Sequence, residues 1–223
     1  MLNYTFSKEL DDLAGVRYPG EDSLEYSVGT INRPDVASAT VVYQLPFGTG
    51  HSWNSSNRVL SQLISNWQLS GIFTFANGAP LTITGTCNGY GVIDASCYPN
   101  DTPGFVGSPW LHGSLSTVAS VTTTPFLNKA AFTNPVAGAY GDAARTAPYG
   151  LLAPGVADID VSVRREFAIR ESVRLALQAD AFDVNNAVYF AAPNTTLSSS
   201  SFGTFTSQAN QPRKLQLSAR VTF

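Results

Sequence analysis

Polar and apolar side chains alternate without a break over the last ten residues of the chain, 214–223. Successive side chains of a β-strand point to opposite sides, so this segment predicts a strand with one apolar and one polar face. The apolar positions are Leu215, Leu217, Ala219, Val221 and Phe223, and the polar positions are Lys214, Gln216, Ser218, Arg220 and Thr222. At about 3.4 Å per residue and a tilt near 45°, such a strand spans about 25 Å, the height of the apolar band around a transmembrane barrel. An edge strand of a soluble β-sandwich alternates in the same way, so the rest of the chain has to separate the two.

Five further segments show the same alternation and predict five more strands. They cover residues 2–7, 36–45, 66–76, 157–164 and 173–182. In the last three strands of the chain, the polar positions carry charged or amide side chains that we expect to face the lumen of a barrel. These residues are Asp158, Asp160, Arg164, Arg174, Gln178, Asp180, Lys214, Gln216 and Arg220.

The connections between the predicted strands are long and short in strict alternation. Residues 8–35, 77–156 and 183–213 are long stretches rich in Gly, Pro, Ser, Thr and Asn, which we interpret as flexible loops. Residues 165–172 form a short turn, and residues 46–65 are intermediate, with a short helix expected at 58–65. Transmembrane barrels have long extracellular loops and short periplasmic turns, so the alternation predicts an all-β, antiparallel, up-and-down barrel segment with long extracellular loops.

Aromatic residues collect near the expected strand ends, as they do at the two membrane interfaces of such barrels. Tyr43, Phe47, Trp67, Phe167 and Phe223 fall at the short-turn rim, and Phe75, Tyr189 and Phe190 fall toward the long-loop rim. Aromatic residues also end strands in other β proteins, so this pattern supports the barrel without deciding it.

The composition fits a wall that faces lipid. Only 13% of the residues are charged, against about 25% in soluble proteins, and the mean hydropathy is +0.00. The apolar runs are far shorter than the roughly 20 residues that a membrane helix needs. No basic cluster suggests nucleic-acid binding, because the net charge is −3 and the basic residues are dispersed.

Two further features concern the compartment and the extent of the chain. Cys87 and Cys97 lie close together in a loop rich in Gly, Asn and Pro, which favours a local disulfide in an oxidising compartment over a metal site. The first residues, Met-Leu-Asn-Tyr-Thr-Phe-Ser-Lys, read as part of a strand and lack the features of a signal peptide. We therefore expect the chain to be a fragment of a longer exported protein.

Four segments in order resemble the C-terminal barrel of TonB-dependent outer-membrane receptors, and most closely the Oar-like subgroup, which carries a carboxypeptidase-regulatory-like domain. The segments are Asn3-Tyr-Thr-Phe-Ser-Lys-Glu-Leu-Asp-Asp12, Val42-Tyr-Gln-Leu-Pro-Phe-Gly-Thr-Gly50, Asn66-Trp-Gln-Leu-Ser-Gly-Ile-Phe-Thr-Phe with Gly78-Ala-Pro-Leu-Thr-Ile83, and Pro212-Arg-Lys-Leu-Gln-Leu-Ser-Ala-Arg-Val-Thr-Phe223. The resemblance spans nearly the whole chain except residues 85–125. Residues 181–190 match the subgroup's Asn-rich element only in part.

The resemblance implies a role in substrate uptake across the bacterial outer membrane. It implies that residues 1–223 are about six strands of a larger, 22-stranded barrel, with the plug domain and the earlier strands absent. The partners it implies are the lipid bilayer, the rest of the barrel, the plug, TonB acting through that plug, and the outer-membrane assembly machinery. Phe223 resembles the terminal aromatic residue that this machinery reads as an assembly signal.

The residues give little support to catalysis, and we expect neither enzymatic activity nor a cofactor. His51 and His112 lie in unrelated loops without other zinc ligands at a suitable spacing, and no Gly-x-Ser-x-Gly elbow is present. Asp158 and Asp160 share a strand face and could hold Ca²⁺, but carboxylates balanced by Arg164 and Arg174 are the simpler interpretation.

Two alternative functions stay open from the sequence. One is a secreted β-sandwich binding module of the carbohydrate-binding type, with Trp53, Trp67 and Trp110 as stacking platforms. The other is a porin-like barrel without a plug.

Overall fold

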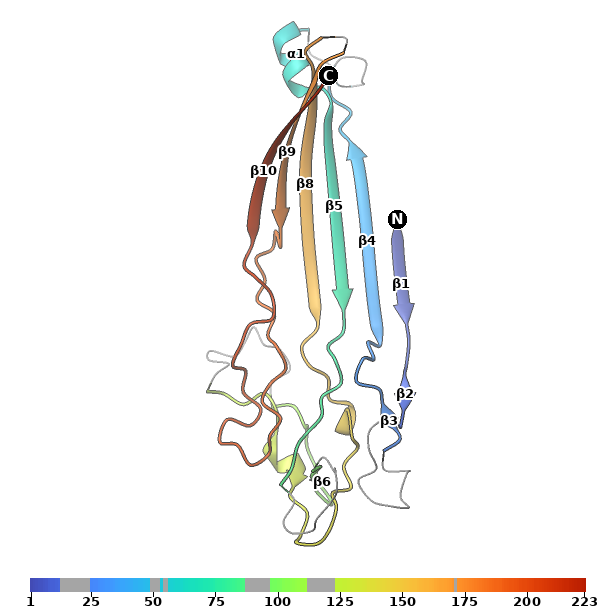
Figure 1. Cartoon of the computed structure of the whole chain (residues 1–223), viewed down its shortest axis with the longest axis vertical. Coiled ribbons are helices and arrows are strands. Elements are labelled where there is room, and N and C mark those ends of the chain that lie inside the picture. Colours follow the sequence, from blue (N-terminus) through green and yellow to red (C-terminus); the bar gives the residue numbers. More distant parts are fainter. Residues whose placement is uncertain (13–24, 49–52, 54–55, 87–96, 112–122, 171) are drawn as a thin grey trace.

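A six-stranded antiparallel sheet forms the main body of the protein (Figure 1). The computed structural model describes residues 1–12, 25–48, 53, 56–86, 97–111, 123–170 and 172–223. The order in the sheet is β1-β4-β5-β8-β9-β10, so strands that are neighbours in the sheet follow one another along the chain. Their bounds are β1 Leu2–Phe6, β4 Asp35–Gln44, β5 Trp67–Ala76, β8 Val156–Ala168, β9 Arg174–Phe182 and β10 Lys214–Thr222.

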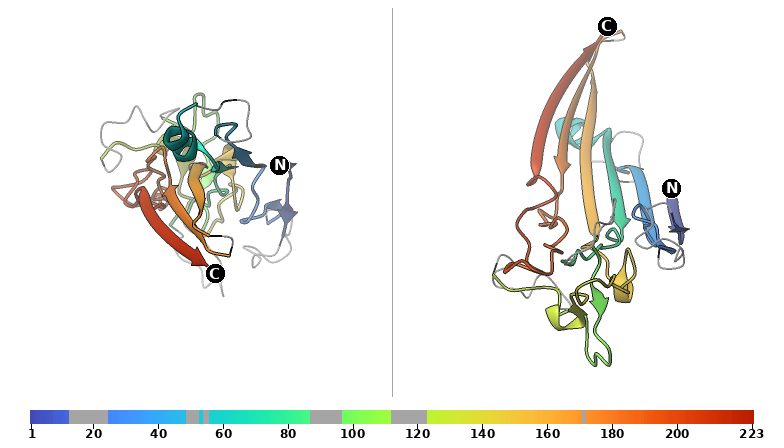
Figure 2. Two further views of the ribbon diagram at one scale, coloured as in Figure 1. Left: turned by 90° about the horizontal axis from the view of Figure 1, so that it is seen from above. Right: turned by 60° about the horizontal axis from the view of Figure 1, so that its bottom comes forward.

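The sheet is an up-and-down meander that remains open at both edges. All five neighbouring pairs are antiparallel. Figure 2 shows β1 and β10 at opposite edges of the sheet, and the two strands do not pair with each other. The predicted fold class and all six predicted strands are confirmed, with five of the six strands bounded within one residue of the expected positions.

The prediction for β8 was wrong at its C-terminal end. Residues 165–168 continue the strand, with Arg165 opposite Leu177 and Phe167 opposite Leu175 on β9. The sequence pattern predicts that this strand ends at Arg164 and that residues 165–172 form a turn, since the charge of Arg165 interrupts the apolar positions. The structure accommodates this charge by burying Arg165, which is 6% exposed. The turn itself is shorter, residues 169–173, and is closed by hydrogen bonds between Arg170 and Val173.

The predicted helix is confirmed as α1, Arg58–Ile64. The side chain of Asn57 caps its N-terminus by accepting hydrogen bonds from the backbone N–H groups of Val59 and Leu60. The helix lies at the same end of the sheet as the 169–173 turn and the C-terminus, which we call the α1 end (Figure 1). No described helix is long and apolar enough to cross a membrane.

The opposite end, which we call the loop end, is folded where the structure describes it. The interpretation of the long connections as flexible loops was wrong for these parts, because their apolar side chains pack together. They contain two small ribbons and two 3-10 helices: β2 Leu10–Asp11 with β3 Ser27–Val28, β6 Asn100–Asp101 with β7 Phe132–Thr133, η3 Lys129–Ala131 and η4 Pro148–Gly150.

The buried apolar core lies in the loop end and not against the six-stranded sheet. Its members come from two connections that are far apart in sequence, 77–155 and 183–213. They are Leu81, Ile83, Leu127, Ala131, Phe132, Leu151, Leu197 and Phe202. On the sheet, by contrast, large apolar side chains such as Leu215 and Leu217 are 77% and 83% exposed. Apart from the part beside α1, the sheet therefore presents an apolar surface that nothing in the described chain covers.

Candidate functional site

Strand register sorts the side chains of the sheet into two faces of opposite chemistry. Directly opposite residues in antiparallel strands share a face, so the pairs Gln216 with Asp180 and Ser218 with Gln178 place these four on one side. We call this side the polar face. Its charged and amide or hydroxyl members are Asn3, Thr5, Ser38, Thr40, Gln44, Gln68, Ser70, Thr74, Asp158, Asp160, Ser162, Arg164, Glu166, Arg174, Gln178, Asp180, Lys214, Gln216, Ser218, Arg220 and Thr222.

The other side, the apolar face, carries aliphatic and aromatic side chains along every strand. It includes Leu2, Tyr4, Phe6, Ala37, Ala39, Val41, Tyr43, Trp67, Leu69, Phe73, Phe75, Ile159, Val161, Val163, Phe167, Leu175, Leu177, Ala179, Ala181, Leu215, Leu217, Ala219 and Val221. Its charged members, Asp35 and Arg165, lie near the two ends of the strands. Asp35 is held there by the Tyr4 hydroxyl at 2.6 Å and the Asn77 side-chain amide at 2.7 Å.

All nine residues expected to face a lumen share the polar face. The structure thus brings together Asp158, Asp160, Arg164, Arg174, Gln178, Asp180, Lys214, Gln216 and Arg220 on one side of β8, β9 and β10. That this side lines the interior of a closed barrel stays a prediction.

Toward the α1 end, the polar face carries a small network of ion pairs. Glu166 accepts hydrogen bonds from Arg164 at 3.3 Å and from Arg174 at 3.0 Å. These groups border a hollow of about 580 Å³ that Gln44 and Gln68 also line. The side chains are one-third to two-thirds exposed, so each pair contributes at most about 1 kcal/mol to stability. The network therefore places charges of both signs on the polar face and adds little to its rigidity.

Glu166 belongs to the site although the sequence analysis missed it. The prediction ended the strand at residue 164, which left Glu166 in a turn. Alternation continued beyond that point, with Arg164 and Glu166 on one side and Arg165 and Phe167 on the other. A search for alternating residues that allows one arginine at an apolar position would have extended the strand to include Glu166.

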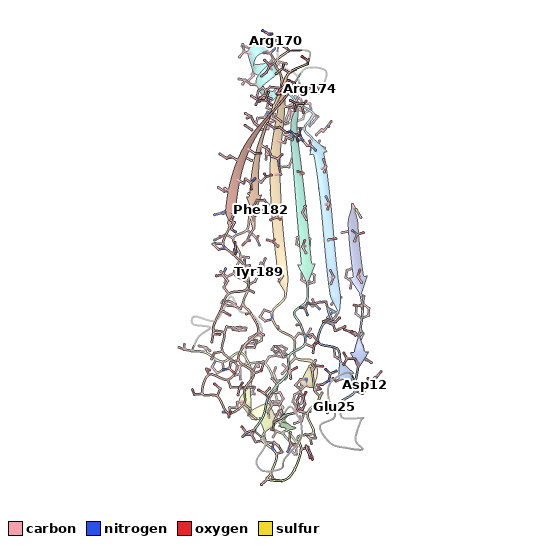
Figure 3. All side chains as sticks on the ribbon, in the orientation of Figure 1. Asp12, Glu25, Arg170, Arg174, Phe182 and Tyr189 are labelled. Atoms are coloured by element: carbon pink, nitrogen blue, oxygen red, sulfur yellow. The ribbon has the colours of Figure 1, made fainter. Side chains whose placement is uncertain are left out.

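Toward the loop end, three carboxylates gather on the polar face. Asp183 follows β9 and its backbone N–H donates to the Asp160 side chain at 3.0 Å. Its own side chain accepts from the backbone of Ala187 and from Asn210, at 3.0 and 3.1 Å. Asp158, Asp160, Asp183 and Lys214 all border a hollow of about 320 Å³. Figure 3 shows the segment from Phe182 to Tyr189 leading from the sheet into this region, with Arg170 and Arg174 at the far α1 end.

The remaining candidates divide between the two ends and the residues that the structure does not describe. Phe223 follows β10 at the α1 end and is 94% exposed. Cys97 is disulfide-bonded, while Cys87 lies outside the described residues, so their pairing stays a prediction. His51 and His112 also lie outside the described residues. Among the residues that are described, no three His, Cys, Asp or Glu side chains lie close enough to hold a metal ion together.

The three tryptophans do not form a common platform. Trp67 begins β5 at the α1 end, whereas Trp110 lies in the loop end, where its ring packs edge-on against Phe126 with centroids 4.8 Å apart. Trp53 contacts Phe47 in the connection that precedes α1. The structure thus separates the side chains on which the carbohydrate-binding alternative depended.

The loop end holds a buried ion pair that the sequence analysis did not anticipate. Arg145, 5% exposed, pairs with Asp11 and also donates to the backbone carbonyl of Glu25 at 3.3 Å. These contacts tie the β2-β3 ribbon to the 77–155 connection. Elsewhere in the loop end, burial raises the pKa of Asp101 above its usual range, and the nearby Asp142 carboxylate adds to the effect.

The comparisons with known proteins agree with a sheet that is apolar on one side and polar on the other. A search of curated proteins and a search of solved structures found no match. The model of one family, described as the outer membrane beta barrel domain, matches residues 1–216. Because this match covers nearly the whole chain, the protein belongs to the outer membrane beta barrel domain family and is located in the bacterial outer membrane.

Proposed function

We propose that this chain forms the C-terminal part of the wall of a TonB-dependent receptor of the Oar-like subgroup, which takes up a substrate across the outer membrane. The observation that carries the proposal is the open sheet itself, with an apolar face for lipid and a charged polar face for an aqueous lumen. The four segments that resemble this subgroup are the reason for preferring it among barrel proteins. The proposal gives the chain no catalytic role and no cofactor.

The free edges of the sheet imply that the wall extends further. In hydrocarbon, each unpaired backbone N–H or C=O group costs several kcal/mol, so only closed barrels are stable there. The outer edges of β1 and β10 have no neighbour among the described strands. We therefore propose that these edges pair with other strands of one larger barrel, which has about 22 strands in this receptor class. A plug domain inside that barrel would be the part to which TonB binds.

The orientation follows from the unequal ends of the sheet. Barrels of this kind have long extracellular loops and short periplasmic turns. We therefore propose that the loop end is extracellular and that the α1 end, with the 169–173 turn, is periplasmic. The charged polar face then runs from one side of the membrane to the other.

A conductance experiment tests the uptake function against the plugless alternative, which the family assignment leaves equally open. The complete protein that contains this chain is inserted into a planar lipid bilayer, beside a version from which the plug is deleted. A plug blocks the lumen, so we expect no steady current through the complete protein and a steady current after the deletion. Steady current through the complete protein would support a porin. The absence of current in both would reject a transport barrel.

Removal of Phe223 is expected to reduce assembly while leaving stability almost unchanged. The ring is 94% exposed, so its loss removes little burial from the folded chain. As an assembly signal it would act before insertion is complete. The amount of protein in the outer membrane is measured by heat-modifiable gel mobility, and the stability of the inserted fraction by urea unfolding. Wild-type amounts of inserted protein after the deletion would refute the role, and Phe223→Tyr is the matched variant that should assemble normally.

A further inference from the structure

Arg165 is a cation in an unusual position. Among the described strand residues, it is the only basic one on the apolar face, where its register partners are Trp67 on β5 and Leu177 on β9. Its neighbour Arg164 points to the polar face and pairs with Glu166. Two adjacent arginines are thus presented to opposite sides of the same wall.

The surroundings of Arg165 stabilise its charge only in part. The guanidinium carbon lies 4.0 Å from the centre of the Phe167 ring and 5.3 Å from that of Trp67, which are cation–π distances. One terminal nitrogen donates to the backbone carbonyl of Gln62 in α1. The Nε–H group, although buried, has no hydrogen-bond partner, and no described carboxylate forms an ion pair with this residue. A buried cation that no carboxylate of the described residues neutralises is costly, so the site favours an anion.

The depth of Arg165 in the wall corresponds to the level of lipid phosphates. On β5 the apolar face runs from Phe75 to Trp67, which is about 27 Å along a strand and about 20 Å perpendicular to a membrane at a tilt near 40°. That distance approaches the roughly 25 Å height of the apolar band in such barrels. Arg165, opposite Trp67, lies at the periplasmic edge of this band, where the hydrocarbon gives way to headgroups.

Helix α1 covers this position and presents an apolar surface of its own. Val59, Leu60 and Leu63 are 67%, 48% and 55% exposed, and the helix has no acidic residue. Between α1 and the end of β8 lies a hollow of about 430 Å³, whose lining includes Val59, Leu63, Arg165, Glu166 and Phe167. The Glu166 carboxylate is engaged by Arg164 and Arg174 and so does not neutralise Arg165. Phe167 lines the hollow and also belongs to the apolar face, on which Leu175 and Leu177 of β9 lie opposite Phe167 and Arg165.

We propose that this hollow binds a phospholipid of the periplasmic leaflet. Its phosphate lies against the Arg165 guanidinium that lines the hollow, and its acyl chains lie along the apolar face next to Phe167 and Leu177. The exposed apolar residues of α1 rest in the same interface, so the helix and the lipid together seal the periplasmic edge of the wall. This inference rests on the outer-membrane location and on the proposed orientation that places the α1 end at the periplasm, and it does not require that the barrel be TonB-dependent.

Lipid binding can be measured on the protein extracted from the outer membrane and stripped of lipid in a mild detergent. The probes are a phosphatidylglycerol and a phosphate-free betaine lipid with the same acyl chains, each titrated by native mass spectrometry. Charge-assisted hydrogen bonds contribute enough that we expect about tenfold tighter binding of the phosphatidylglycerol. Arg165→Gln should abolish this preference, whereas Arg164→Gln, the same change one residue away on the polar face, should preserve it.

A second pair of variants keeps the test decisive if Arg165→Gln fails to fold. Leu63 lines the mouth of the hollow and is half exposed, so Leu63→Glu and Leu63→Gln should both fold. The glutamate should repel the phosphate and remove the preference, while the glutamine should retain it. Inorganic phosphate in excess should not displace the lipid, because the acyl chains supply part of the binding.

Any one of the following results would overturn the proposal. Equal affinity of the unaltered protein for the two lipids would show that the phosphate is not recognised. A preference that survives in Arg165→Gln or in Leu63→Glu, or that is lost equally in Arg164→Gln, would show that this hollow is not the site. Complete displacement by inorganic phosphate would identify a site for a free anion instead of a lipid.

Discussion

Replacement of Leu217 by arginine is expected to lower the free energy of unfolding from liposomes by about 2 to 4 kcal/mol. Leu217 lies in the middle of β10, opposite Ala179, and its side chain is 83% exposed on the apolar face. If the apolar face meets lipid, as proposed, an arginine there must bring its charge into hydrocarbon. The adjacent Ser218→Arg should cost much less, because its side chain falls on the polar face near Arg164 and Arg220.

The dependence on depth separates a bilayer from a protein core. The same substitution at Leu215 and Val221, nearer the two ends of β10, should cost less, falling toward about 0 to 1 kcal/mol at the interfaces. A soluble sandwich would also penalise one face, but its core need not produce such a profile. Equal penalties at the three positions would argue that another protein layer, and not lipid, covers the apolar face.

The sheet was predictable from the sequence because every strand of a barrel wall separates two environments, and its polar and apolar residues alternate accordingly. Where one face meets lipid and the other meets water, polar and apolar residues must alternate, and the six segments could be found without knowledge of their partners. The end of β8 was predicted wrongly because local contacts there allow a charged residue on the apolar face. Burial under α1 and stacking on Phe167 and Trp67 allow Arg165 on the apolar face.

The polar face was only partly predictable, for a related reason. Residues within strands follow from alternation, and all nine candidates fall where the pattern placed them. Asp183 joins them through a left-handed backbone conformation just beyond β9, with φ of 51°. No periodic signal marks such a position, and Asp183 reaches Asp160 only because the chain turns there.

The folded loop end shows where sequence reasoning fails altogether. Its core joins residues more than a hundred positions apart, such as Leu81 and Leu197, in segments without regular periodicity. Compositions rich in Gly, Pro, Ser and Thr are compatible with flexible loops and with loops that pack on each other. Only the three-dimensional contacts distinguish the two, because the few apolar residues that decide the outcome are scattered.

Leu127→Ala is expected to open the loop end while leaving the sheet intact. Leu127 is completely buried in the core of the loop end, and replacing a buried leucine by alanine costs about 2 to 5 kcal/mol. The backbone beside it joins two connections, since the N–H of Phe126 donates to the carbonyl of Gly203 at 2.7 Å. Loss of the side chain therefore loosens the 77–155 and 183–213 connections together. Hydrogen exchange followed by mass spectrometry should show amides in both connections exchanging about thirtyfold faster or more.

The control for this substitution is Leu111→Ala, which removes the same atoms from a side chain that is 47% exposed nearby. It should change exchange only slightly, since little burial is lost. Amides of β5, β8 and β9 should keep their protection in both variants, because the core of the loop end contains no residue from the six-stranded sheet. Faster exchange throughout the sheet in Leu127→Ala would show that the loop end and the wall unfold as one unit. Unchanged exchange in the two connections would show that this core does not hold the loop end together, and the loop end would then be a set of independent loops.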